Sequence, residues 1–153
     1  VKQGILVRGE SSWGFPNILV PKPNAKPTDL PRLTTNFKKL NDVVIKMNHP
    51  TPLIDDILTD LVGARVFTKI DLRDGFWNIE LSEESQSYCA MTTTFGLYKY
   101  RRMPQGACNS PSAFQYIIET ILSPAIDDGV KVIVYIDDII IVSENWKDHM
   151  TSL

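Results

Sequence analysis

Two runs of β-branched residues, 132–135 and 139–142, flank a pair of carboxylates, Asp137 and Asp138. Val, Ile and Tyr suit a buried pleated surface, so the pattern predicts a β-hairpin with both carboxylates at its tip. Asp is also common in turns that have no further function, because its side chain hydrogen-bonds to nearby backbone. Two adjacent like charges repel unless a cation neutralises them, which favours a divalent metal. Such a site needs a further ligand from elsewhere in the chain.

Apolar positions in residues 51–63 recur at helical spacing. Thr51 suits the cap of this predicted helix, Pro52 its first position and Gly63 its end. Four apolar residues share one face, so we expect the helix to lie on a core: Ile54, Ile57, Leu58 and Leu61.

Residues 65–71 are predicted to form a strand, and residues 72–77 a turn into a short helix or bend. Asp71 therefore ends a strand, where side chains commonly reach a site at the edge of a sheet. Asp71 is equally suited to capping a helix, so taken alone it is ambiguous.

The remaining pattern predicts two strands, 88–93 and 97–103, joined through Gly96. It also predicts a helix that begins at Ser110 and Pro111 and ends before Pro124. Half of the ten prolines fall in residues 1–31, which leaves 18–20 as an edge strand or a loop-rich hairpin. The order of elements predicts an α+β fold with an antiparallel sheet and helices on one face.

Composition narrows the class of protein. The chain has 153 residues, 43% of them hydrophobic, which is enough for a real core. No apolar stretch approaches the roughly 18 residues of a membrane span. The two cysteines have no metal or disulfide spacing, so we expect reduced thiols. The chain begins with Val and ends in a polar, helix-like stretch, 144–153, and we expect a fragment of a longer polypeptide.

The net charge of −2 is unevenly distributed. Residues 1–50 hold eight Lys or Arg against three acidic residues, whereas residues 51–153 hold eight against fifteen. Basic surface near the start can meet phosphates, and the acidic excess near Asp71 and Asp137 can hold metal.

An ordered series of motifs resembles the polymerase domain of reverse transcriptases from LTR retrotransposons and retroviruses, most closely the gypsy-like group. The resemblance covers nearly the whole chain, from about Trp13 to His149. The motifs, in chain order, are Leu40-Asn41, His49-Pro50-Thr51-Pro52, Asp71-Leu72-Arg73-Asp74-Gly75-Phe76, Met103-Pro104-Gln105-Gly106, Ser110-Pro111-Ser112-Ala113-Phe114-Gln115 and Tyr135-Ile136-Asp137-Asp138-Ile139.

The resemblance implies a right-hand polymerase palm with partial fingers. Residues 1–50 and 80–103 would be fingers-like, and residues 51–79 and 104–153 palm-like. The thumb, the connection and ribonuclease H would be absent. In such elements the domain belongs to a polyprotein that also carries protease and integrase.

The implied reaction is RNA-directed DNA synthesis, in which a primer 3′-hydroxyl attacks the α-phosphate of a deoxynucleoside triphosphate. Two Mg²⁺ ions, or Mn²⁺, would stabilise the attacking and leaving oxygens. By resemblance, Asp71 and Asp137 are direct metal ligands and Asp138 completes the catalytic triad.

The resemblance also assigns contacts to the substrates. Phe76 would exclude a ribose 2′-hydroxyl, although aromatic residues are often plain core, and Gln105 would contact sugar and base. Lys22 and Arg32 fall where the fingers hold the triphosphate, although a longer, proline-rich loop leaves the register at Lys22 open. Contacts to an RNA or DNA template with its primer would come from Lys38, Lys39, Arg101 and Arg102, with Trp13 and Lys99 as further candidates.

Two other functions stay open. The chain can be a catalytically silent nucleic-acid-binding remnant of a decayed element, or another right-hand polymerase such as a viral RNA replicase, which Phe76 and Tyr135 disfavour. For the parent element we expect a virus-like particle in the cytoplasm or a nuclear location, and no membrane.

Overall fold

The computed structural model describes residues 3–21, 26, 31–50 and 52–153, with the side chain of Arg32 left out. The chain divides into two compact units: residues 1–46 with 76–110, and residues 47–75 with 111–153. Each unit is described by itself below. We call them the first unit and the second unit.

The first unit is built on a sheet that has the strand order β1-β6-β5-β2-β3 among the described residues. Its neighbours pair antiparallel except β2 and β5, which pair in parallel through Phe15 and Pro16. The strands are β1 (Leu6–Arg8), β2 (Phe15–Val20), β3 (Arg32–Thr35), β5 (Ala90–Thr93) and β6 (Gly96–Tyr100). The hairpin expected for residues 18–20 is confirmed, because they pair with β3.

Aromatic rings form the core of the first unit. Phe37 packs edge-to-face on Phe15 and on Tyr100, at centroid distances of 5.2 and 5.9 Å. Trp13 lies against Phe15 and Tyr88 and packs, partly buried, on this core. The short helices α1 (Lys38–Asn41), α3 (Gly75–Asn78, of which Gly75 belongs to the second unit) and α4 (Glu83–Tyr88) complete the secondary structure here.

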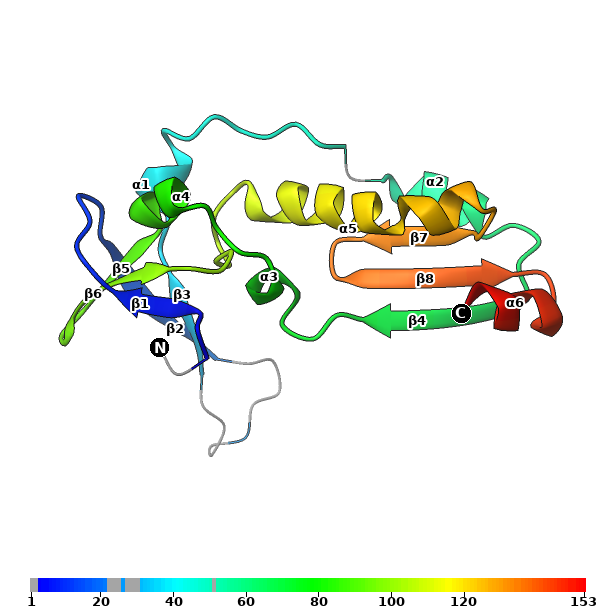
Figure 1. Cartoon of the computed structure of the whole chain (residues 1–153), viewed down its shortest axis with the longest axis horizontal. Helices are drawn as coiled ribbons and strands as arrows, with labels where there is room; N and C mark the ends of the chain where they lie inside the picture. The colour runs from blue at the N-terminus through cyan, green and yellow to red at the C-terminus, as the bar shows by residue number, and fades with distance from the viewer. Residues whose placement is uncertain (1–2, 22–25, 27–30, 51) are drawn as a thin grey trace. The chain divides into compact units, whose positions relative to one another are not determined.

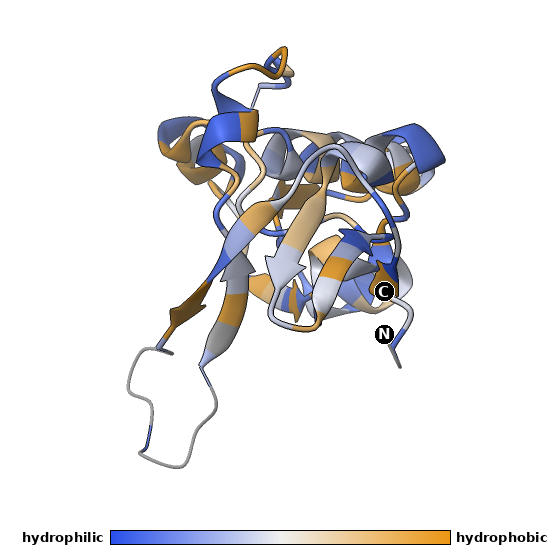
Figure 2. Cartoon of the chain, turned by 90° about the vertical axis from the view of Figure 1, so that its left-hand side faces the viewer, coloured by the Kyte–Doolittle hydropathy of each residue, from blue (hydrophilic) through white to orange (hydrophobic). Residues whose placement is uncertain are grey.

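The β2–β3 hairpin carries apolar side chains that are exposed at the end of β2. In Figure 2 this end, next to the grey trace, is coloured as hydrophobic. The exposed residues are Ile18, Leu19 and Val20, with Leu33 on β3.

The second unit has an antiparallel sheet with the strand order β4-β8-β7 (Figure 1). The strands are β4 (Val66–Asp71), β7 (Val132–Tyr135) and β8 (Asp138–Ser143), so the hairpin and the strand predicted from the sequence are confirmed. β8 is central and its side chains are largely buried, as expected for a run of Ile and Val.

Helix α5 (Ser110–Asp127) runs beside β7 and is longer than predicted. The prediction that it ends before Pro124 is wrong, because the helix continues through that proline. Pro124 has no N–H for the carbonyl of Thr120, and the hydroxyl of Ser123 donates to this carbonyl at 3.0 Å instead. Ser110 is the first helical residue, and its hydroxyl donates to the carbonyl of Pro104.

Helix α2 (Ile54–Asp60) is shorter than the predicted 51–63. It is preceded by Leu53, without a side-chain cap, and Thr51 lies outside the described residues. The expectation that α2 lies on a core is wrong for the described residues, because no residue of α2 is buried and Ile54 and Leu58 are 67% and 57% exposed. Periodicity shows which face is apolar, but not whether another element covers it.

Helix α6 (Trp146–Ser152) is fixed to the sheet by a buried histidine. The ring of His149 contacts the hydroxyl of Thr68 on β4 at 2.7 Å and the hydroxyl of Ser143 on β8 at 3.1 Å. No helix in the described part of the chain is long and apolar enough to cross a membrane.

Candidate functional site

The β7–β8 hairpin presents Asp137 at its tip. Tyr135 pairs with Asp138, so Ile136 and Asp137 are the two residues of the turn. Ile136 adopts φ +56°, a left-handed conformation that is costly for a β-branched side chain. Asp137 is exposed, as a residue that binds a ligand at a tip must be.

Strand β4 brings the third carboxylate to the same end of the sheet. Asp71 is the register partner of Asp138, and the N–H of Leu72 donates to the carbonyl of Asp137 at 3.2 Å. Register partners in a sheet point to the same face. The ambiguity of Asp71 is thus resolved in favour of a strand end beside the two other carboxylates.

A lysine side chain contacts one of these carboxylates. The ammonium of Lys69 donates to Oδ2 of Asp138 at 2.9 Å. The hydrogen bond and charge of Asp138 hold the pKa of Lys69 above its usual value, and the charges of Asp71 and Asp137 raise it further. The charges of all three carboxylates therefore act on Lys69, and the local electrostatic field favours a positive charge.

The chemistry of the donor set suits a hard divalent cation, because carboxylate oxygens are the ligands that Mg²⁺ prefers. Within the described residues, however, no group of three or more His, Cys, Asp or Glu side chains is arranged so that it could hold a metal ion. In this conformation Asp138 is engaged by Lys69. The assignment of the three aspartates as metal ligands stays a prediction.

The loop of Gln105 belongs to the first unit and is held from three sides. Gly106 adopts φ +92°, and a Cβ there would lie 3.3 Å from the carbonyl oxygen of Thr35. Asn41 donates to the carbonyl of Gly106 at 2.9 Å and accepts from the N–H of Cys108 at 2.9 Å. With the bond from Ser110 to Pro104, these contacts leave the Gln105 side chain exposed on a fixed turn.

Phe76 lies on α3 and is half-buried, in the first unit. Its neighbour Gly75 is buried in the second unit, where a Cβ would lie 2.9 Å from the ring of Phe114. The proposed contacts of Phe76 and Gln105 with a nucleotide are not tested by these positions. Lys22 lies outside the described residues, and for Arg32 only the backbone, in β3, is described.

The four basic residues predicted to bind nucleic acid all belong to the first unit. Lys38 and Lys39 are exposed on α1. Arg101 lies 3.5 Å from a carboxylate oxygen of Glu80, and Arg102 donates to the carbonyl of Asn78 at 3.3 Å. The predicted contacts of these four residues with nucleic acid are not tested by these positions.

Sequence reasoning missed the residues that support the carboxylates. The buried side chain of Gln115 donates to the carbonyl of Val134 and accepts from the N–H of Ile136, so it holds the start of the turn. The signal was present, because Gln115 is a polar residue on the apolar side of a predicted helix. Lys69 gave no signal, because a lysine on a strand is usually plain surface.

Comparison with known proteins agrees with the motifs. The family model "Reverse transcriptase (RNA-dependent DNA polymerase)" matches residues 20–153. The Pol polyprotein of transposon 297 from Drosophila melanogaster is 38% identical over the whole chain, and that of transposon gypsy from the same organism is 35% identical over 98% of it. The chain spans only 14% of each of these polyproteins.

Solved structures give the same result. The foamy viral protease-reverse transcriptase in complex with an RNA/DNA hybrid has a TM-score of 0.83 and 29% identity over 98% of this chain and 19% of that one. Another foamy viral structure of this kind, in complex with double-stranded DNA, has a TM-score of 0.81 and 28% identity over 99% of this chain and 25% of that one. The α+β fold expected from the sequence is thus confirmed. The chain belongs to the reverse transcriptase (RNA-dependent DNA polymerase) family.

Proposed function

We propose that this chain is the part of a retroelement polyprotein that adds deoxynucleotides to a primer on an RNA or DNA template. The observation that carries the proposal is the position of Asp71, Asp137 and Asp138 at one end of the second unit's sheet, with Lys69 hydrogen-bonded to Asp138. The basic lysines of the first unit would contact the template-primer backbone.

Asp71 and Asp137 would hold two Mg²⁺ ions, with Asp138 in a looser contact. When bound, the ions stabilise the attacking and leaving oxygens of phosphoryl transfer. The chain's own contribution is to fix the carboxylates: β4 and β8 set Asp71 opposite Asp138, and the turn presents Asp137. Lys69 would have to leave Asp138 for that oxygen to reach a metal.

Phe76 would pack against the sugar of the incoming nucleotide and exclude a 2′-hydroxyl. Gln105 would contact the sugar and base, while Arg32 and Lys22 would bind the triphosphate, for which the guanidinium fork of arginine is suited. The support for Gln105 is the rigid loop that exposes it, and the support for the others is the family to which the chain belongs.

Primer extension tests the proposal. The chain, and the polyprotein that contains it, would be given an RNA template, a DNA primer and either deoxy- or ribonucleotides, with Mg²⁺ or Mn²⁺. Asp137→Asn should lower deoxynucleotide addition by at least about 100-fold, because a direct ligand is lost. Asp60→Asn, an exposed aspartate on α2, is the matched control and should retain activity.

The alternatives predict different results. Binding of template without addition, in both the chain and the polyprotein, would favour a silent nucleic-acid-binding remnant. Efficient incorporation of ribonucleotides would favour an RNA replicase and would remove the proposed role of Phe76.

A further inference from the structure

The side-chain amide of Gln115 is fully buried, and its nitrogen donates to two different acceptors. Its Nε2 donates to the carbonyl of Val134 at 2.8 Å and to Oε1 of Glu119 at 2.6 Å. Its Oε1 accepts from the N–H of Ile136 at 2.7 Å. Val134 and Ile136 lie on the two sides of Tyr135, so one side chain spans the start of the turn.

Three fixed partners set which way the Gln115 amide faces, and Glu119 is one of them. The carbonyl of Val134 and the carboxylate of Glu119 only accept, whereas the N–H of Ile136 only donates. If the amide were turned over, its oxygen would face two acceptors and its nitrogen would face a donor. The carboxylate therefore favours the single orientation in which Gln115 accepts from Ile136.

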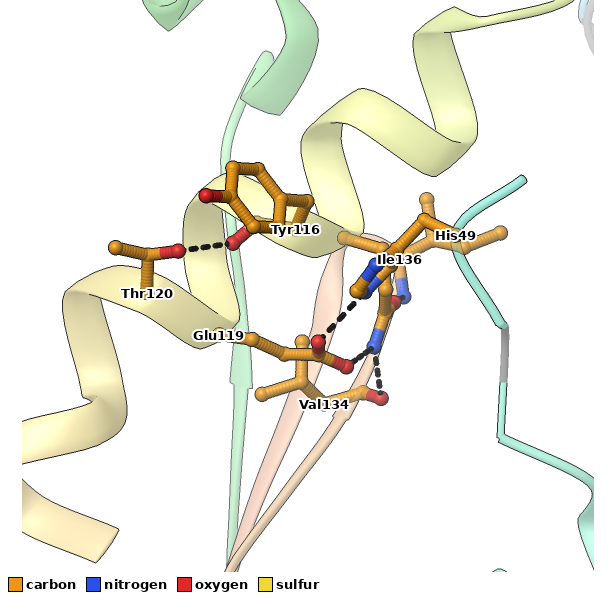
Figure 3. Close-up of polar contacts among 7 residues, drawn as sticks. His49, Tyr116, Glu119, Thr120, Val134 and Ile136 are labelled. Carbon is orange, nitrogen blue, oxygen red and sulfur yellow. Dashed lines mark hydrogen bonds and ion pairs between the residues drawn. The ribbon is translucent and has the colours of Figure 1, made fainter. Parts of the chain in front are cut away.

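His49 holds the other oxygen of the same carboxylate. Its Nε2–H donates to Oε2 of Glu119 at 2.7 Å, and its ring lies edge-on to Tyr116, with 5.5 Å between ring centroids. Figure 3 shows the contacts running from His49 through Glu119 toward the backbone of Val134. Both oxygens of Glu119 are thus engaged, one on each side.

We propose that Glu119 and His49 are positioning residues for the turn that presents Asp137. In this arrangement, which we call the relay, His49 fixes Glu119, Glu119 orients Gln115, and Gln115 holds the left-handed Ile136 in place. The relay goes beyond the proposed function and rests on it only for the role of Asp137. All its members belong to the second unit.

The simpler explanation of the contact between His49 and Glu119 is an ordinary, partly exposed ion pair. Such pairs contribute little to the stability of the fold. The bond from Gln115 to Glu119 argues against it, because it joins a fully buried amide to a charged oxygen at 2.6 Å. Charge-assisted bonds of this kind are about twice as strong as neutral ones. The relay therefore acts on the buried amide of Gln115 and not only at the surface.

Amide hydrogen exchange measured by NMR on the ¹⁵N-labelled chain tests the relay. Glu119→Ala should speed exchange of the Ile136 amide by about five- to tenfold, the effect of losing roughly one hydrogen bond's stabilisation. The Val142 amide, which donates to Lys131 in the same sheet, should be unchanged, so the ratio of the two rates separates positioning from general destabilisation.

Three further variants sharpen the test. Glu119→Gln keeps an oxygen that can accept from Gln115, so it should restore slow exchange at Ile136. Asp127→Ala, an exposed acidic residue on the same helix, is the matched control and should change nothing. His49→Ala should give about a two- to threefold effect, and combining it with Glu119→Ala should add nothing, because residues of one network are not additive.

Equal exchange rates at Ile136 in Glu119→Ala and Asp127→Ala would overturn the relay, and so would a His49→Ala effect that adds fully to that of Glu119→Ala. These measurements use no metal, nucleotide or template. A failure of primer extension would therefore refute the proposed function without changing the result for the relay. Equal Mn²⁺ affinity in the wild-type chain and Glu119→Ala, measured by NMR line broadening, would show that the relay does not position Asp137.

Discussion

Two turns in this chain present a proposed functional side chain, and each contains a residue with positive φ. The two turns differ in the residue type at that position. The turn before Asp137 places Ile136 at φ +56°, whereas the turn after Gln105 places Gly106 at φ +92°. Each is held by the amide side chain of a helical residue: Gln115 in the second unit and Asn41 in the first.

The difference lies in what stabilises the left-handed residue. Glycine adopts positive φ without steric penalty, so the Gln105 loop needs its hydrogen bonds only for position. Isoleucine at positive φ is strained by about 1–3 kcal/mol, so the Asp137 turn depends on the bonds from Gln115. A strained turn with a buried support is therefore the more vulnerable of the two.

The largest expected effect comes from removing that support. Gln115→Leu leaves the N–H of Ile136 and the carbonyl of Val134 without their partner, which should lower the free energy of unfolding by about 2–4 kcal/mol in urea denaturation. Gln86→Leu, which loses one half-buried bond to the carbonyl of Leu81, is the control and should cost clearly less. Equal losses would mean that Gln115 has no special role.

Gly106→Ala should destabilise the other turn by about 1–2 kcal/mol, because an L-residue is strained at φ +92°. Gly129→Ala isolates the strain, since Gly129 has φ +88° and nothing within 4 Å of an added Cβ. The loss of unfolding free energy in Gly106→Ala beyond that in Gly129→Ala measures the cost of the contact with Thr35. If there is no excess, the close approach at Gly106 is unimportant.

Lys69→Met should tighten Mn²⁺ binding to the carboxylates about threefold, because it removes a competing cation whose partner is Asp138. Lys131→Met is the control, because Lys131 directly precedes β7, at the end of the β7–β8 hairpin away from the carboxylates. Calorimetric titration would measure the affinity. Weaker binding in Lys69→Met would mean that the ammonium organises the site instead of competing for it.

The smallest effect is expected at Ile136 itself. Ile136→Asn should change the free energy of unfolding by less than about 1 kcal/mol, because asparagine tolerates the left-handed region and offsets the lost apolar contact. Ile136→Val keeps the β-branch and therefore the strain, and serves as the comparison. A loss above about 2 kcal/mol in Ile136→Asn would show that the turn is not strained.

Several elements could be predicted from the sequence because their signals are local. The β-branched runs around Asp137 define β7 and β8, and Asp71 ends β4. The motif order indicated the reverse transcriptase family, which the comparisons confirm. Which residues hold the metals and the nucleotide stays a prediction, because family membership assigns roles that no contact in the structure tests.

Other features were not indicated by the local pattern. Helix α5 passes Pro124 because Ser123 replaces the missing bond, and α2 leaves its apolar face exposed. The sequence by itself determined the strands that carry Asp71 and flank Asp137, and the family, whereas β1 was not predicted and Asp138, expected at the tip, begins β8. Only the tertiary structure decided that Lys69 meets Asp138 and that His49, Glu119 and Gln115 support the turn, because register and helix packing bring together residues that local patterns cannot pair.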